Sequence, residues 1–249
     1  MYISSTYKSH PRIEGIKING HISMAGVTSC HDVYRGMIAG RLIAVKDLGV
    51  YERENLVTAF KEILCANIFR LVDIYCPTLN LLMAKERVYL VMDYVSPEKW
   101  CYLQQNDFTS HDKKLIFNII KVFVIDCFIQ NSDRSRNNIC IYRNNGKKRV
   151  MVTDHHRTFI PYTSIYDGFL IEFIKALNPS NKDISDSIHV INKTLQPSLI
   201  IEEVEKLKKN FMSNFEFNEF DYFFNEIIDS IQSPGISKII TTLLTEYPP

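Results

Sequence analysis

The sequence predicts an α+β fold in two lobes, a small antiparallel sheet with one helix followed by a mostly helical part. Two observations lead to this class. Residues 13–95 consist of short β-rich runs separated by turn residues, apart from one stretch, residues 51–72, whose apolar positions recur near a 3.6-residue period. After residue 159 the patterns are helical. A boundary at Ser96-Pro97 therefore gives an N-terminal lobe, residues 1–95, and a C-terminal lobe, residues 96–249.

Composition excludes several classes of protein. The 249 residues are 46 % hydrophobic and 23 % charged, as in a soluble globular protein, and the formal net charge of +1 provides no field that would attract nucleic acid. No apolar run has transmembrane length and the N-terminus lacks the apolar core of a signal peptide. We expect a cytoplasmic protein, with secretion as an effector without a cleaved signal left open. The six cysteines show no paired spacing, which predicts free thiols. The oligomeric state is not predicted.

Short strands are expected throughout the first lobe. Asn19-Gly20 and Ala39-Gly40 have the composition of tight turns between strands, and Lys85-Glu86 separates two later runs. The expected strands cover residues 13–18, 32–37, 41–46, 79–84 and 87–95. Such a series of strands predicts an antiparallel sheet.

Candidate catalytic and metal-binding residues lie in one stretch of the second lobe, residues 115–154. Residues 115–129 form a run too apolar for a surface helix, and the polar cluster NSDRSRNN, residues 131–138, follows it. Two short strands around the turn at residues 144–147 then lead to Asp154. A hairpin brings its two ends together, so Asn138 and Asp154 are expected to meet. Amide and carboxylate oxygens are ligands that Mg²⁺ prefers, and Asp133 would accept or orient the proton of an attacking hydroxyl.

These residues resemble the HipA-like kinases. NSDRSRNN matches their loop N-[ST]-D-x-x-x-x-N, and VTDHHRTF is similar to their metal segment I-D-H-G-x-x-F. Phosphatidylinositol-type kinases share a similar loop. The resemblance implies a two-lobed protein-kinase-like fold, with Asp133 as the catalytic residue and Asn138 and Asp154 as Mg²⁺ ligands. His156 departs from the pattern, because the relatives have Gly there. No companion ligand spacing suggests zinc, and adjacent histidines point to opposite sides of an extended chain, so His155 and His156 are interpreted as residues that bind no metal.

A lysine and a glutamate in the first lobe complete the resemblance. Residues 43–46 (IAVK) match the kinase strand whose Lys reaches the nucleotide phosphates. Glu62, within the helix expected over residues 51–72, is the predicted partner of Lys46. Glu54 is the competing candidate, but its place in the first helical turn is already explained by the helix dipole.

Two further stretches are expected to contact the nucleotide. In a kinase, residues 21–30 (HISMAGVTSC) would cover the phosphates, although a long hairpin turn explains this stretch as well. The run ending at Val95 resembles the strand that leads into a kinase hinge, with Met92 beside the adenine. The residues expected to contact the nucleotide are Ser23, Gly26, Thr28, Ser29, Lys46, Met92, Asp93, Tyr94 and Val95.

Helices without a catalytic signature are expected to complete the chain, over residues 164–177, 183–194, 199–211, 219–231 and 237–244. The function implied is ATP- and Mg²⁺-dependent phosphorylation of a hydroxyl, first of all a serine or threonine of a protein substrate, with a toxin or effector role open. The alternatives are a kinase for a small-molecule or lipid hydroxyl, and a nucleotide-binding pseudokinase that serves as an interaction module.

Overall fold

A computed structural model describes residues 13, 15–22, 31–103, 113–131, 134–159, 169–212 and 220–232. The chain divides into two compact units. The first comprises Met1–Ile63 and Pro77–Trp100, and the second comprises Leu64–Cys76 and Cys101–Pro249. The predicted boundary after Val95 stays a prediction; in the structure the division follows Trp100, and a segment from the middle of the first half belongs to the second unit.

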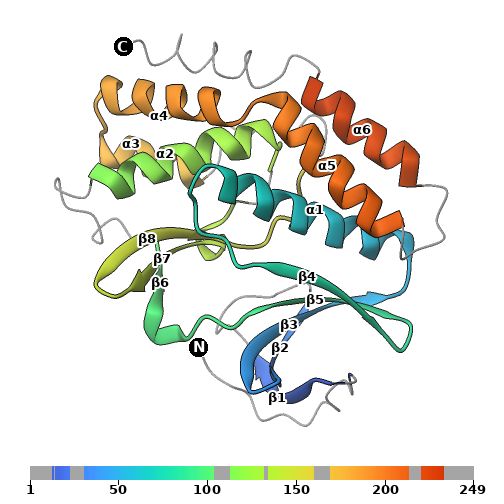
Figure 1. The fold of residues 1–249 in the computed structure, drawn as a ribbon. Helices are drawn as coiled ribbons and strands as arrows, with labels where there is room; N and C mark the ends of the chain where they lie inside the picture. The colour runs from blue at the N-terminus through green and yellow to red at the C-terminus, as the bar shows by residue number, and fades with distance from the viewer. Residues whose placement is uncertain are drawn as a thin grey trace. The chain divides into compact units, whose positions relative to one another are not determined.

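The first unit contains a five-stranded antiparallel sheet in the order β1-β2-β3-β5-β4 (Figure 1). Its strands are β1 (Lys17–Ile22), β2 (Asp32–Ile38), β3 (Arg41–Val50), β4 (Leu79–Ala84) and β5 (Arg87–Asp93). The turn at Ala39-Gly40 has positive φ at both residues, 47° and 78°, which is the twist that joins adjacent antiparallel strands. The predicted antiparallel sheet is therefore present.

The prediction of a turn at Asn19-Gly20 is wrong. Both residues lie inside β1, where Ile18 pairs with Gly36 and Gly20 pairs with Arg35, so that Asn19 is the extra residue of a β-bulge. The strand expected over residues 13–18 accordingly begins later and continues to Ile22, opposite Val33. A glycine in a strand often marks a bulge, and here the pairing with β2 continues past it.

The two faces of this sheet differ. One face buries an apolar cluster, made of Ile13, Ile16, Tyr34, Ile43, Val45 and Tyr89. Side chains alternate along a strand, so Ala44 and Lys46 point to the other face of β3. Helix α1 (Arg53–Leu71) begins in the first unit and continues into the second, and its residue Glu62 contacts Lys46 on that other face.

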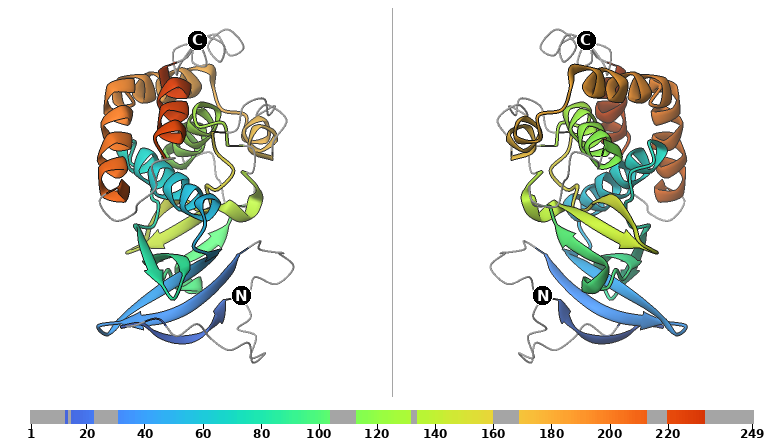
Figure 2. Two further views of the ribbon diagram at one scale, coloured as in Figure 1. Left: turned by 90° about the vertical axis from the view of Figure 1, so that its right-hand side faces the viewer. Right: turned by 90° about the vertical axis from the view of Figure 1, so that its left-hand side faces the viewer.

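The second unit combines helices with a small sheet of β6 (Trp100–Tyr102), whose first residue ends the first unit, β7 (Ile139–Asn144) and β8 (Lys147–Val152). Its helices are α2 (Lys113–Phe128), α3 (Phe169–Leu177), α4 (Asn181–Thr194), α5 (Pro197–Met212) and α6 (Phe220–Gln232). Every residue of α2 from Asn118 to Phe128 is buried, which confirms that this run is too apolar for a surface helix. Figure 2 shows α2 inside the unit, with α3 on one side and α5 on the other. The helix expected over residues 237–244 lies outside the described residues.

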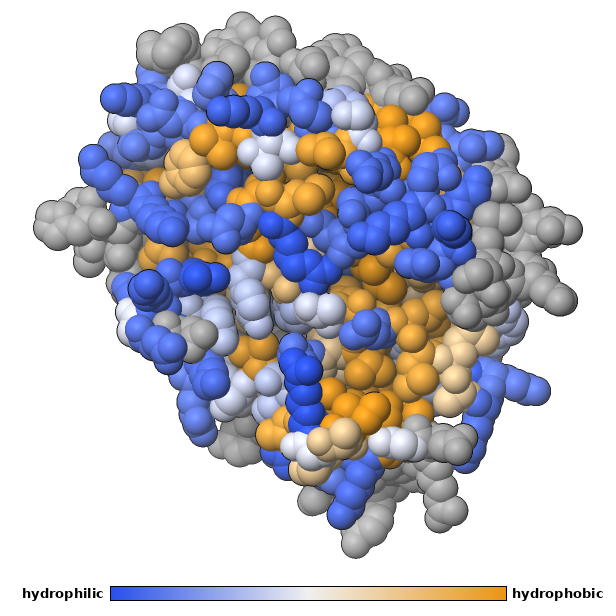
Figure 3. All heavy atoms as spheres, in the orientation of Figure 1, coloured by the Kyte–Doolittle hydropathy of each residue, from blue (hydrophilic) through white to orange (hydrophobic). Residues whose placement is uncertain are grey.

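Helix α5 has the amphipathic character predicted for it. Ile200, Val204 and Leu207 are buried. Hydrophilic side chains gather over this helix in Figure 3. The exposed residues of the helix include Glu202, Glu205, Lys206 and Lys209. In the part of the chain that the structure describes, no helix is both long enough and apolar enough to span a membrane.

The β4–β5 turn allows the cost of positive φ at residues other than glycine to be tested. Lys85 and Glu86 have φ of 50° and 58°, a region that costs an ordinary residue about 1–2 kcal/mol. Changing them together to Asn-Gly is expected to raise the free energy of unfolding by about 1 kcal/mol. The measurement is the urea midpoint. The opposite exchange at Asn145-Gly146, which has the same conformation, is the matched control and should lower the midpoint by a similar amount. An unchanged midpoint in both variants would contradict the prediction.

Candidate functional site

The first element of the candidate site is a buried ion pair in the first unit. Lys46 Nζ lies 2.6 Å from Glu62 Oε1, and the two side chains are 8 % and 3 % exposed. Lys46 is on the central strand β3, where Val33 and Leu90 are its neighbours across the ladder. The predicted pairing of Lys46 with Glu62 is confirmed, whereas the competing Glu54 is an exposed residue of the first turn of α1. Burial holds the ammonium group in one position, because a buried charge must stay beside its counter-charge.

At the end of β5, two of the backbone groups expected near the adenine already form hydrogen bonds within the protein. The Tyr94 N–H donates to Leu42 O at 3.3 Å, and the Trp100 indole N–H donates to Val95 O at 3.3 Å. The Asp93 carboxylate lies 3.0 Å from the Arg41 guanidinium at the surface. Tyr94 therefore extends the pairing with β3 by one residue, and its N–H is not available to an adenine.

Several predicted site residues lie outside the described residues. They are Ser23, Gly26, Thr28 and Ser29 of the expected phosphate loop, and Asp133, the expected catalytic residue. Their assignments stay predictions. The residue that follows Asp133, Arg134, is among the described residues.

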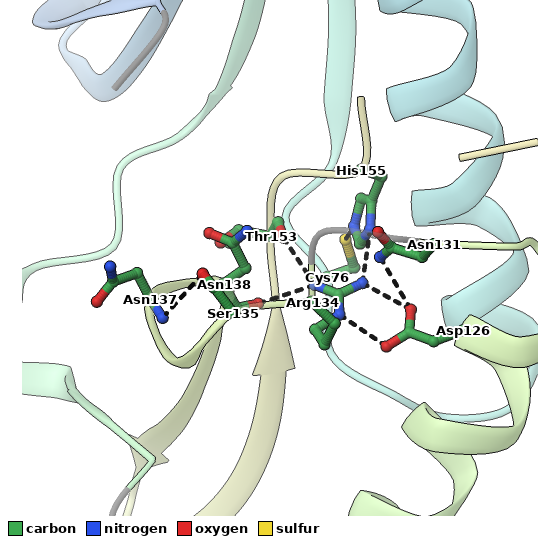
Figure 4. A network of polar contacts seen from close by, with 9 residues as sticks. All are labelled: Cys76, Asp126, Asn131, Arg134, Ser135, Asn137, Asn138, Thr153 and His155. Atoms are coloured by element: carbon green, nitrogen blue, oxygen red, sulfur yellow. Dashed lines mark hydrogen bonds and ion pairs between the residues drawn. The ribbon is translucent and has the colours of Figure 1, made fainter. Parts of the chain in front are cut away.

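Arg134 is the centre of a buried polar network in the second unit (Figure 4). Its Nε donates to Asp126 Oδ2 at 2.8 Å and its Nη2 donates to Asp126 Oδ1 at 3.0 Å, so the two groups form a bidentate pair. Asp126 lies on the buried helix α2 and also accepts from the Asn131 amide at 3.0 Å. Burial opposes the charge on Arg134, but attraction and hydrogen bonding to Asp126 outweigh it and raise the pKa of the guanidinium.

The same guanidinium joins the loop before β7 to the segment after β8. Arg134 Nη1 donates to Asn138 O at 3.0 Å and to Thr153 O at 2.9 Å. This role of Arg134 is not among the predictions from the sequence. A signal was present, since a carboxylate at position 126 within an apolar helix requires a buried partner, but nothing local pointed to Arg134 as that partner.

His155 completes the network and its protonation follows from its neighbours. Arg134 Nη2 lies 3.1 Å from His155 Nδ1, and because a guanidinium only donates, Nδ1 must accept. The proton of the ring is therefore on Nε2, which faces Cys76 Sγ at 3.5 Å. The ring also stacks on Phe69, with centroids 5.1 Å apart. His155 is thus a neutral core residue.

The β7–β8 hairpin brings the two predicted metal ligands together at the backbone. Ile139 pairs with Val152, and the Thr153 N–H donates to Asn138 O at 3.0 Å, so Asn138 lies next to the residue that precedes Asp154. Asp154 has φ of 59°, a conformation that Asp tolerates better than most residues. Both residues are partly exposed. An amide oxygen and a carboxylate at one hairpin end fit the preference of Mg²⁺ for hard oxygen ligands.

The side chain of His156 also faces Asp154 at this end of the β7–β8 hairpin. Its Nδ1 lies 2.8 Å from Asp154 Oδ1, and the two side chains are 16 % and 31 % exposed. His155 is buried whereas His156 is turned to Asp154, which confirms that the adjacent histidines point in different directions. The departure from Gly at position 156 therefore places an imidazole beside a predicted metal ligand.

The fold is that of a kinase-like protein. Among solved structures the chain is similar to the proinflammatory kinase CtkA of Helicobacter pylori, with a TM-score of 0.64 and 13 % identity over 92 % of this chain and 96 % of that one. It also aligns with HipA of Shewanella oneidensis MR-1, from a toxin–antitoxin complex with HipB and operator DNA, with a TM-score of 0.46 and 8 % identity over 97 % and 70 % of the two chains. No family model and no curated protein matches the sequence. The likeness to CtkA confirms the predicted α+β kinase-like fold class.

Proposed function

We propose that the chain is an ATP- and Mg²⁺-dependent phosphotransferase that acts on a hydroxyl, with serine or threonine of a protein as the first substrate class. The observation that carries the proposal is the buried Lys46–Glu62 ion pair on a kinase-like fold. Burying two charges is expensive, and packed apolar side chains would stabilise the unit as well or better. A lysine that is nonetheless held so rigidly is suited to bind nucleotide phosphates.

The other residues take the roles that phosphoryl transfer requires. Asp133 would accept or orient the proton of the attacking hydroxyl, and Asn138 and Asp154 would hold Mg²⁺, which neutralises charge on the phosphates. Arg134 would position these groups, because it bonds the backbone on both sides of the hairpin. The expected phosphate loop would contribute Ser23, Gly26, Thr28 and Ser29.

The adenine would be bound by two backbone groups after Met92. Successive residues of an extended strand direct their N–H and C=O groups to opposite sides. The Tyr94 N–H points to β3, so the groups of Asp93 and Val95 point away from β3. The Val95 carbonyl accepts from Trp100. Among the groups that remain, the Asp93 C=O and the Val95 N–H are the pair proposed to bind the adenine edge.

One observation favours a second candidate function, a nucleotide-binding pseudokinase that serves as an interaction module. The Asp154 carboxylate is hydrogen-bonded to His156, where a kinase has Gly, and that contact competes with metal binding at Asp154. The two functions differ in whether phosphate is transferred.

The test is incubation of purified protein with γ-labelled ATP and Mg²⁺, alone and with a lysate. We expect label on protein with the wild type and none with Asp133→Ala or Asp154→Ala. Asp186→Ala, an exposed change on α4, is the matched control and should label as the wild type does. Label that persists in both site variants would overturn the assignment of these residues.

Two other outcomes select among the alternatives. Absence of label together with thermal stabilisation by Mg²⁺-ATP would favour the pseudokinase or a small-molecule or lipid acceptor. The absence of both label and nucleotide binding would overturn the proposal.

A further inference from the structure

The distance between His156 and Asp154 suits two ligands of one ion as well as a hydrogen bond. Nδ1 and Oδ1 are 2.8 Å apart. Neighbouring ligands of an octahedral ion, each about 2.1 Å from it, are about 3 Å apart. Both atoms could therefore bind one ion if they moved apart by a few tenths of an ångström. Both side chains are partly exposed, so that water and ions have access to them.

The local backbone is responsible for this placement. The left-handed conformation of Asp154, with φ of 59°, changes the direction of the chain directly after β8. The next side chain, His155, enters the core beneath Arg134 and Phe69, and His156 is turned back to Asp154. Asn138 lies at the same hairpin end, because its carbonyl accepts from the Thr153 N–H.

The Nδ1 atom of His156 can be a hydrogen-bond donor or a metal ligand. A carboxylate only accepts hydrogen bonds, so in the ion-free protein Nδ1–H donates to Asp154. Metal binding requires a lone pair on Nδ1. An imidazole nitrogen provides one when it carries no proton, so His156 Nδ1 can either donate to Asp154 or bind an ion beside it, but not both at once.

We propose that His156 is a third ligand of the Asn138–Asp154 metal site and that it makes this site favour divalent transition ions, such as Mn²⁺, over Mg²⁺. The inference rests on the proposed function, which assigns the metal to Asn138 and Asp154. Mg²⁺ prefers oxygen ligands and keeps several of its waters. Imidazole nitrogen suits the transition ions better, and affinity for such a site rises from Mn²⁺ to Co²⁺. The proposal reverses, for His156, the prediction from the sequence that neither histidine of the pair binds a metal, which rested on the absence of a companion ligand spacing typical of zinc.

The experiment measures metal binding to the full chain without nucleotide. The electron paramagnetic resonance signal of free Mn²⁺ reports Mn²⁺ binding, and competition with Mg²⁺ gives the ratio of the two affinities. For His156→Ala and His156→Gly we expect the Mn²⁺ affinity to fall by at least about tenfold, with a larger loss for Co²⁺ and a change of less than about threefold for Mg²⁺. His189→Ala removes an exposed imidazole from α4 of the same unit and is the matched control. In the wild type, Mn²⁺ should broaden the imidazole NMR signals of His156 before those of His189.

The outcomes separate this inference from the proposed function. If both His156 variants keep the wild-type ratio of Mn²⁺ to Mg²⁺ affinity while Asp154→Asn weakens the binding of both ions, the metal site stands and the role of His156 is overturned. If Asp154→Asn changes neither affinity, or if the wild type binds no Mn²⁺ at millimolar concentration, the metal assignment itself falls and the inference falls with it. A loss of Mn²⁺ preference in the His156 variants only, with unchanged unfolding midpoints, supports the inference.

Discussion

Replacing Lys46 by Met is expected to lower the free energy of unfolding by about 3–5 kcal/mol and to abolish phosphate transfer. The loss of stability follows from the carboxylate that is left behind, since Glu62 is 3 % exposed and has Lys46 at 2.6 Å. Glu62→Leu should cost a similar amount because it leaves the ammonium of Lys46 buried. The free energies of unfolding are measured by urea denaturation.

The double variant Lys46→Met/Glu62→Leu separates the structural from the catalytic contribution. Replacing a whole buried ion pair by apolar side chains is often neutral or stabilising, so we expect most of the lost stability to return. Under the proposed function, transfer should stay absent, since the lysine proposed to bind the phosphates has been removed. A double variant as unstable as the single variants, or one that still transfers phosphate, would contradict this interpretation of the pair.

The second large effect is expected at Arg134. Arg134→Met leaves the buried carboxylate of Asp126 without its charge partner and deprives the carbonyls of Asn138 and Thr153 of a donor, so we expect a loss of about 3–5 kcal/mol. Arg134→Lys retains the charge but cannot reproduce the bidentate contact together with the two carbonyl contacts. It should therefore fold, with a loss of about 1–3 kcal/mol.

Arg134→Lys also tests whether this residue positions the proposed metal ligands Asn138 and Asp154. Because the guanidinium ties the backbone of Asn138 to that of Thr153, a looser tie should lower the affinity for Mn²⁺ even where the protein is fully folded. The control is Arg149→Lys, an exposed residue of β8, which should change stability by less than about 0.5 kcal/mol. Wild-type stability together with wild-type Mn²⁺ affinity in Arg134→Lys would contradict the positioning role.

The sequence by itself determined the elements whose signals are local. The apolar run before residue 129 predicted the buried helix α2, and the repeated turn residues predicted antiparallel strands on both sides of Ala39-Gly40. Glu62 could be chosen as the partner of Lys46 because Glu54 already had an explanation in the first helical turn. Hairpin geometry likewise predicted that Asn138 would lie near Asp154, since the two ends of a hairpin meet whatever else the chain does.

Only the tertiary structure decided the features that depend on backbone conformation or on contacts between separate elements. Asn-Gly has the composition of a turn, but β1 continues through it as a bulge because pairing with β2 extends to Ile22. Asp126 required a partner, and the packing of the loop against α2 selected Arg134. The side chain of His156 faces Asp154 because Asp154 adopts the left-handed conformation, which no spacing of residue types reveals. Periodicity reports which face of an element is buried, whereas the groups that meet at a site are chosen by long-range packing.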